Sequence, residues 1–375
     1  RIEVSGGTVG ALSGSNDANI LLSGGTFRLI QPEEGASLDL RKILAPEHCY
    51  QNGYRHLYGD LDRTTGYKFV NMDVAECTPH KYSDGRNSTG FCLYCNHQCL
   101  HPAINETGVC TTCSLQMQAS VTCDDVVTYY PTIQEAVKAA TGSTAENVAV
   151  KLLSDAVLTE TVSIARDMTL NLNGKQFSVQ DDSIQLTVSA GAFTLTDSGT
   201  GSGSCGAKLA ITGGTVTMAG GKIAQITATG GTMTLSGGEV TQLTEAGGRI
   251  EVSGGTVGAL SGSNDANILL SGGTFKLIQP EEGAELDLRK ILAPDHCYQN
   301  GSFRHPYEML GYKTTGYKFT NMDVAECTPH KYSDGHISST GFCLYCNHEC
   351  LHEAGATNDF KCTECGLPFA ASLAY

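Results

Sequence analysis

The sequence predicts a mainly β protein in which a parallel β-helix, with coils of about 17 residues, alternates with small Cys/His modules. Three observations predict this fold. Glycine pairs and apolar residues recur at a short period, a much longer segment occurs twice, and cysteines recur with histidines at fixed spacing. The composition agrees, because 44 glycines, no tryptophan and only 17% charged residues are atypical of helical bundles.

The short period lies between residues 213 and 260. Gly-Gly pairs alternate there in steps of 7 and 10, beginning at Gly213, Gly220, Gly230, Gly237, Gly247 and Gly254. The two steps add up to 17 residues, and apolar residues repeat at the same period, so that Val216, Met233 and Ile250 occupy equivalent positions. Alternating apolar residues that stop at Gly-Gly predict short strands, joined by turns with positive φ or close backbone approach. Such coils bury their inward side chains against the coils above and below, so the interior should be filled.

The long repeat is about 250 residues, since Arg1–Phe27 reads identically to Arg249–Phe275. We interpret the chain as part of a tandem array of such units. The expected segments are the last coils of a first β-helix at 1–40, a connector with the first module at 41–118, a complete β-helix at 119–285, and a connector with the second module and the start of another unit at 286–375.

A capping helix is expected at the start of the complete β-helix. Thr132 and Glu135 form a Thr-x-x-Glu capping box, and apolar residues follow at helical spacing up to Gly142. Strands should follow at residues 148–153, 157–164 and 168–172. Residues 38–44 and 286–292, each containing Leu-x-Leu-Arg-Lys-Ile-Leu, predict a short bridging helix in each copy.

The segments Tyr129–Val137, Leu152–Asp155 and Thr169–Lys175 resemble the opening of pectin-lyase-like β-helices. More closely, they resemble those of large secreted or cell-wall-attached surface proteins of Gram-positive gut bacteria. The resemblance covers roughly residues 119–280 and 1–30. It implies a right-handed β-helix and an extracellular location, and says little about activity.

The cysteines and histidines form one pattern in two copies. In each copy the candidate ligands form four close pairs, each made of two cysteines or of a cysteine and a histidine. The spacing inside each pair is the same in both copies while the gaps between successive pairs differ, as expected when metal geometry fixes the short spacing. Eight ligands per module predict two structural Zn²⁺ ions with closed coordination. The predicted ligands are Cys77, His80, Cys92, Cys95, Cys99, His101, Cys110 and Cys113 in the first module, and Cys327, His330, Cys343, Cys346, Cys350, His352, Cys362 and Cys365 in the second.

Two ways of sharing these ligands are open. A sequential arrangement gives each metal three cysteines and one histidine, whereas a cross-braced one joins Cys77, His80, Cys99 and His101 and leaves four cysteines for the other metal. The short separation of Cys95 from Cys99 favours cross-bracing. His97 and His348 are alternative ligands. Disulfides are the competing interpretation, but they give no reason for histidines to keep register with cysteines.

Four cysteines stand outside the pattern: Cys49, its copy Cys297, Cys123 and Cys205. No pairing among them is obvious, and we interpret Cys49 and Cys297 as buried free thiols. A Cys/His nucleophile at His48-Cys49 is disfavoured, because adjacent residues on an extended chain point apart. Residues 264–267 are a weak calcium candidate, and the tyrosines of both connector regions serve a small module core or a contact surface.

The formal charge of −15, without a basic stripe, argues against a nucleic-acid partner. No apolar run approaches the roughly 18 residues of a membrane span, so no membrane insertion is expected within this sequence. We expect a non-enzymatic bacterial surface protein, secreted or wall-attached, whose β-helices are rigid spacers and whose modules bind a host glycoprotein, an immunoglobulin or a glycan. The alternative is a carbohydrate-active β-helix enzyme or its accessory region. A lyase or glycosidase would need clustered acids, whereas these coils carry Thr, Ser and Gly.

Overall fold

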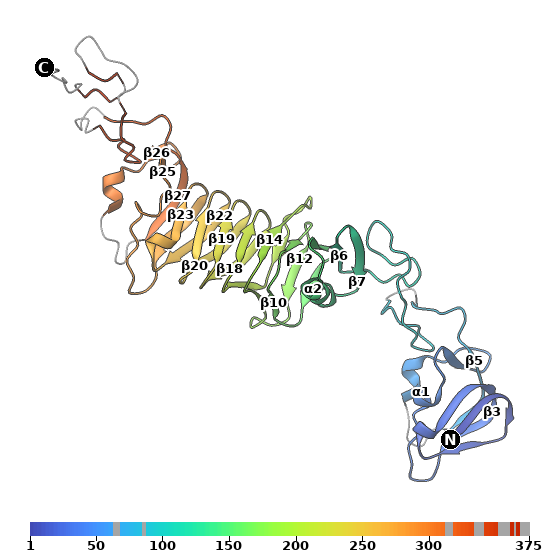
Figure 1. Cartoon of the computed structure of the whole chain (residues 1–375). Coiled ribbons are helices and arrows are strands. Elements are labelled where there is room, and N and C mark those ends of the chain that lie inside the picture. Colours follow the sequence, from blue (N-terminus) through green and yellow to red (C-terminus); the bar gives the residue numbers. More distant parts are fainter. Residues whose placement is uncertain are drawn as a thin grey trace. The chain divides into compact units, whose positions relative to one another are not determined.

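The computed structural model describes residues 1–62, 68–84, 88–311, 318–333, 341–351, 361–363 and 365–367. The chain divides between Met117 and Gln118 into two compact units. Figure 1 shows both units, coloured along the sequence.

The second unit contains a β-solenoid whose first face is a nine-stranded sheet. The strands follow one another in the order β23-β21-β19-β17-β14-β11-β8-β6-β7, and those from β8 to β23 are parallel. Their bounds are β6 Ala119–Cys123, β7 Val126–Tyr130, β8 Val148–Leu152, β11 Met168–Asn171, β14 Ala192–Thr196, β17 Thr215–Met218, β19 Thr232–Leu235, β21 Arg249–Val252 and β23 Ile268–Leu270.

The other strands of this solenoid form a 13-stranded sheet. Its parallel strands are β9 Ala156–Leu158, β10 Val162–Ile164, β12 Gln176–Val179, β13 Gln185–Val188, β15 Ser204–Cys205, β16 Lys208–Ile211, β18 Lys222–Ala228, β20 Glu239–Glu245, β22 Thr256–Gly262 and β24 Thr274–Pro280. The predicted strand at 157–164 is divided into β9 and β10. The chain turns there, and the Gln134 side chain accepts hydrogen bonds from the Thr159 hydroxyl and the Glu160 N–H.

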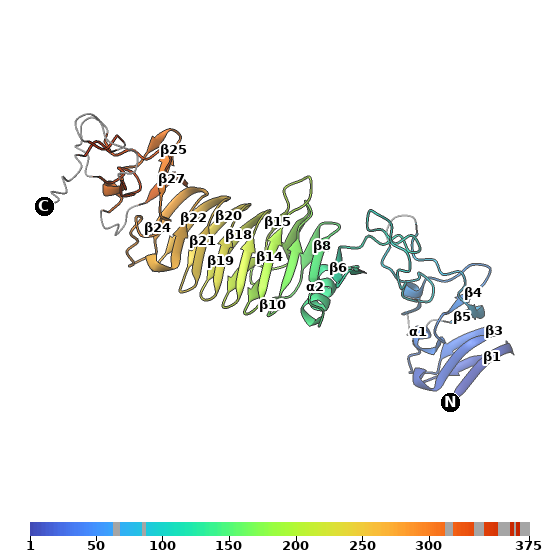
Figure 2. The same cartoon turned by 45° about the horizontal axis from the view of Figure 1, so that its top comes forward.

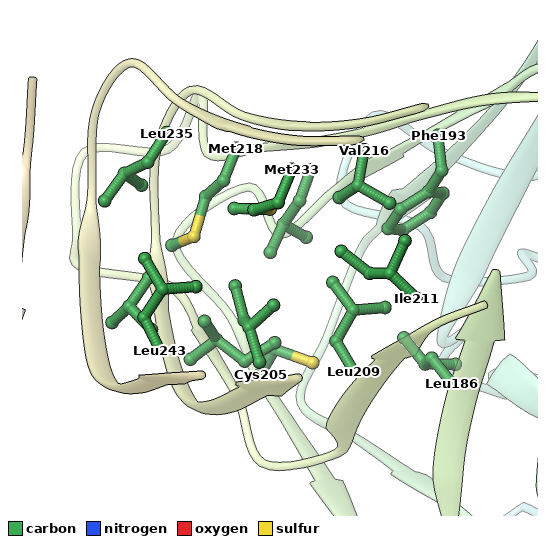
Figure 3. Packing of buried hydrophobic residues seen from close by; sticks show 14 of the residues in the cluster. Leu186, Phe193, Cys205, Leu209, Ile211, Val216, Met218, Met233, Leu235 and Leu243 are labelled. Atoms are coloured by element: carbon green, nitrogen blue, oxygen red, sulfur yellow. The ribbon is translucent and has the colours of Figure 1, made fainter. Parts of the chain in front are cut away.

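The predicted vertical stack is confirmed. Val216 pairs with Met233, and Met233 with Ile250, in adjacent parallel strands, and all three side chains are fully buried. Figure 3 shows Phe193, Val216 and Met233 directed into the same filled interior. Earlier coils are longer than 17 residues, because Met168 pairs with Phe193 and Phe193 with Val216. Strand pairing fixes the stack, while the turns between strands absorb differences in length.

The capping helix is α2, Ile133–Gly142. The Thr132 side chain accepts a hydrogen bond from the Glu135 N–H at 3.2 Å, as the capping-box prediction requires. Ile133, Ala136, Val137 and Ala140 are buried in the solenoid core. Figure 2 shows α2 at the β6–β8 end of the stack. Its buried residues belong to the same core cluster as Val148 and Val150 of β8, so the helix covers apolar side chains that the first coil would otherwise expose.

The opposite end of the solenoid is closed by antiparallel strands that were not predicted. After β24 the chain forms β25 His296–Asn300, β26 Phe303–Arg304 and β27 Phe319–Glu326, and β27 pairs antiparallel with both β24 and β25. Buried Tyr298 packs beneath this cap and donates a hydrogen bond to the Leu288 carbonyl at 3.1 Å. The helix predicted at 286–292 is absent, since residues 288–290 form a turn and Leu292 forms a parallel bridge with Leu270.

The first unit repeats this end of a solenoid. Strands β1 Ile2–Val9, β2 Leu12–Gly14 and β3 Ile20–Pro32 pair in parallel, and β5 Phe69–Glu76 lies antiparallel to β3 and to β4 His48–Gln51. The bridging helix predicted at 38–44 is here the single turn α1, Leu40–Ile43, which the Asp39 side chain caps. The short 3₁₀ helices of both units are η1 Asp17–Asn19, η2 Tyr58–Asp62, η3 Asp265–Asn267 and η4 Tyr307–Gly311.

One carboxylate is buried within the coils. Glu245 is 0% exposed, and its two oxygens accept hydrogen bonds from the N–H groups of Gly247, Ser263 and Asn264, from the Ser263 hydroxyl and from the Asn267 amide. Residues 264–267, the weak calcium candidate, include η3 and are held against this carboxylate. Glu245 therefore organises the longer coil.

Replacing Glu245 should destabilise the second unit in a pH-dependent way. Burial raises the pKa of its carboxyl, but hydrogen bonds from Asn267, Ser263, Gly247 and Asn264 outweigh burial and lower it below its usual value. The stabilisation is present above the unfolded pKa and is lost as pH falls through the folded pKa. We expect Glu245→Gln to cost about 1–3 kcal/mol at pH 7. Urea unfolding at pH 7 and pH 4 would check this, and a difference from wild type that does not shrink towards pH 4 would contradict it.

Candidate metal centres

The first site of the first module forms where β5 ends. Cys77 follows β5 directly, His80 lies three residues later, and Cys92 and Cys95 come from one tight hairpin. The ligand atoms of these four residues all lie within 4.8 Å of one another. The Cys77 and Cys92 sulfurs are 3.8 Å apart, and the Cys95 sulfur is 3.4 Å from Nδ1 of His80. This is the separation that ligands sharing one ion require.

The second site has the same composition. Cys99, His101, Cys110 and Cys113 form another group whose ligand atoms lie within 4.8 Å of one another. The Cys99 and Cys110 sulfurs are 3.9 Å apart, and the Cys113 sulfur is 3.3 Å from Nδ1 of His101. Both groups therefore contain three thiols and one imidazole.

The ligand pairs are placed by two similar hairpins. Asn96 donates its N–H to the Cys92 carbonyl at 3.0 Å, and Ser114 donates to the Cys110 carbonyl at 2.8 Å. Asn96 and Ser114 have φ of 59° and 60°, which reverses the chain within one turn. Burial raises the pKa of the Cys110 thiol, but hydrogen bonds from the backbone N–H of Cys113, from His101 and from the Thr112 N–H lower it to about 6. A hairpin of this kind holds a thiolate ready to bind a cation.

The favoured cross-braced arrangement is wrong, because the structure groups the ligands sequentially. After the hairpin the chain is extended, Phe91 pairs with Gln98, and the Cys99 N–H donates to the Gly90 carbonyl at 2.8 Å. The three extended residues that follow Asn96 span roughly 10 Å. Cys99 can therefore lie in the next site, away from the Cys92–Cys95 pair, without backbone strain.

The second module repeats the first site. Cys327, His330, Cys343 and Cys346 form a group within 4.8 Å, with Cys327 and Cys343 sulfurs 3.7 Å apart and the Cys346 sulfur 3.4 Å from Nδ1 of His330. Three ligands of the following site also gather: Cys350, Cys362 and Cys365. The fourth predicted ligand, His352, lies outside the described residues.

None of the sixteen cysteines is in a disulfide. Cys205 lies in the solenoid interior, where burial raises the pKa of its thiol to about 12. The Cys123 thiol is 3.4 Å from the Ser143 hydroxyl. His48 directs Nδ1 to the Pro46 carbonyl, while Cys49 is buried on the side of Cys77, so this adjacent pair does point apart.

His97 lies beside the first site. Its ring stacks on that of His80 with centroids 4.3 Å apart and planes 1° apart, and its Nδ1 is 3.0 Å from a Glu47 carboxylate oxygen. His348 repeats this arrangement against His330 at 4.1 Å, with Asp295 in place of Glu47 at 2.5 Å. The ligand atoms of Glu47, His80 and His97 form a further close group. The stacked ring restricts the orientation of the ligand imidazole.

In each module an arginine from the antiparallel region before the first site donates hydrogen bonds to the backbone of that site. Arg55 donates to the Thr78 and Pro79 carbonyls at 2.6 and 2.8 Å and lies over the Tyr94 ring. Arg304 does the same at Thr328 and Pro329, over Tyr345. Sequence reasoning missed Glu47 and Arg55, although their reappearance as Asp295 and Arg304 was a signal available in the repeat.

Comparisons with protein-family models, curated proteins and solved structures give no match to this chain. Among the described residues, no helix has the length and apolar character needed to cross a membrane. The repeated Cys/His groups are therefore the main guide to function.

Proposed function

We propose that each module binds two structural Zn²⁺ ions, and that the chain is a non-enzymatic repeat protein of a bacterial surface, with β-solenoids as spacers and the modules as binding elements. The observation that carries this proposal is the gathering of three thiols and one imidazole, without disulfides, at the first site of both modules.

Zinc is the metal that suits these ligands. Thiolate and imidazole donors in a four-ligand group favour tetrahedral Zn²⁺, and four protein ligands leave no position for a substrate. Most of the buried cluster in the second module consists of cysteine sulfur, with Tyr332 as its buried aromatic side chain. With so little apolar core among its described residues, this module needs a metal to fold.

A spacer role is supported by the filled interior of the coils and by the repetition of the modules. Both modules expose a leucine beside the second site, with Leu100 86% and Leu351 68% exposed. Tyr54 and its counterpart Phe303 are also exposed. Apolar side chains exposed at matching places favour contact with a partner, such as a host glycoprotein, an immunoglobulin or a glycan, and repetition raises avidity.

We expect the reduced, zinc-replete chain to contain about four Zn²⁺ ions and to bind at least one member of an array of mucins, plant glycans and immunoglobulins without altering it. Metal content is measured by mass spectrometry and binding by fluorescence. Combined Leu100→Ser and Leu351→Ser replacement should weaken binding at unchanged zinc content, whereas Val157→Ser, at an exposed position on a solenoid strand, should not. A chain without zinc, or one that binds none of these ligands, would contradict the proposal.

A specific observation keeps the enzyme alternative open to test. A surface depression of the second unit is lined by three carboxylates, Asp125, Glu146 and Asp167. One oxygen of Asp167 already accepts the Ala192 N–H at 2.7 Å. Cleavage of a polysaccharide that is lost in Glu146→Gln would replace the spacer proposal with this alternative.

A further inference from the structure

A fifth cysteine lies against the first site of each module. Cys49 pairs with Ala75 across β4 and β5, and Cys77 lies two residues beyond Ala75, so both cysteines face the same side of the cap sheet. The ladder continues to this point, since the Cys77 N–H donates to the Glu47 carbonyl at 2.7 Å. Both cysteines are 0% exposed.

The second copy has the same arrangement. Cys297 pairs with Ala325, the Cys327 N–H donates to the Asp295 carbonyl at 2.7 Å, and both cysteines are 0% exposed. Cys297 also belongs to the buried cluster that holds Cys327, Cys343 and the later cysteines of the module. Two copies thus place a fifth sulfur at the same side of the same site.

We propose that Cys49 and Cys297 are reserve metal ligands, so that the first site of each module can hold its ion with four thiolates as well as with three thiolates and a histidine. The inference rests on the proposed zinc binding. In the exchange, the bond from the metal to His80 breaks, a bond to the Cys49 sulfur forms, and the Cys49 proton passes to the released imidazole or to solvent. No electron is transferred.

A positively charged side chain near each first site favours the four-thiolate form, which is the more negative of the two. A Zn²⁺ ion with four thiolates carries one more negative charge than one with three thiolates and a neutral imidazole. A guanidinium lies nearby in both copies: Arg304 is 3.9 Å from the Cys327 sulfur, and Arg55 occupies the equivalent place. Such a cation offsets the added charge at short range.

The second site of the first module provides a matched comparison. All sixteen cysteines are accounted for, and the four outside the ligand pattern are Cys49, Cys297, Cys123 and Cys205. Cys123 and Cys205 belong to the β6–α2 contact and the solenoid core. Loss of His101 should therefore leave three ligands, whereas loss of His80 should leave four.

The test is Co²⁺ binding to the full reduced chain, which reports each cobalt–thiolate bond by its charge-transfer absorption. His80→Ala should keep about four metal ions per chain, with increased thiolate absorption. His80→Ala combined with Cys49→Ser should lose one ion, as should His101→Ala alone. Cys49→Ser alone should keep all of them with the wild-type spectrum.

Loss of one ion in His80→Ala itself would overturn the inference, as would retention of all ions in the double variant. Failure of the wild-type chain to bind Co²⁺ or Zn²⁺ would instead overturn the proposed function. His330→Ala, with and without Cys297→Ser, repeats the test in the second unit and keeps it decisive if the first unit does not fold.

Discussion

Chelation of the proposed zinc ions from the reduced chain should unfold both modules while the solenoid of the second unit stays folded. Structural zinc contributes roughly 10–16 kcal/mol in small zinc-binding domains, more than the whole stability of most domains. The solenoid core around Val216 and Met233 contains no proposed ligand, so it does not depend on the metal. The antiparallel strands β4 and β5 of the first unit should lose only part of their stability when the metal is removed. Cys77 directly follows β5, but Tyr50, Met72 and Val74 give these strands an apolar core of their own.

Hydrogen exchange read by mass spectrometry can separate these parts. With a zinc chelator and reductant, residues 88–117 should lose nearly all protection, residues 69–76 should lose some, and residues 208–260 should lose none. Cys95→Ser should reproduce part of the effect without chelator, whereas Cys123→Ser, which removes a thiol outside the modules, should not. Unchanged protection of 88–117 after the metal has been removed would contradict the zinc assignment.

The periodic parts of the fold could be predicted from the sequence because their contacts repeat at a fixed spacing. Val216, Met233 and Ile250 are paired neighbours in the stack, and the α2 helix is signalled by Thr132 and Glu135 within one turn. The candidate ligands could be found for the same reason, since the geometry of a shared metal ion fixes their local spacing.

The sharing of the ligands could not be predicted, because it depends on long-range geometry. The positive φ of Asn96 and the pairing of Phe91 with Gln98 decide whether Cys99 belongs to the same site as Cys95 or to the next one. The antiparallel cap was missed although Met72 and Val74 alternate as buried strand residues do. Its strands lie far apart in sequence, and nothing local indicates their partners.

The Gly-Gly turns give the second large expected effect. Gly231 has φ of 65°, and a Cβ added there would lie 2.5 Å from the Gly214 carbonyl oxygen in the neighbouring coil. That oxygen accepts the Thr232 N–H at 3.0 Å, so the coils cannot separate without weakening the ladder. A left-handed conformation alone costs an alanine roughly 1–2 kcal/mol, and the clash adds to it.

Gly231→Ala should therefore lower the free energy of unfolding of the second unit by about 3 kcal/mol or more. Gly206→Ala is the matched control in the same solenoid, because its added Cβ would meet neighbours at an ordinary 3.4 Å. We expect its urea midpoint to stay close to that of the wild type. Equal midpoints for the two variants would mean that the turns yield easily. The glycine period would then reflect composition and not the close approach of successive coils.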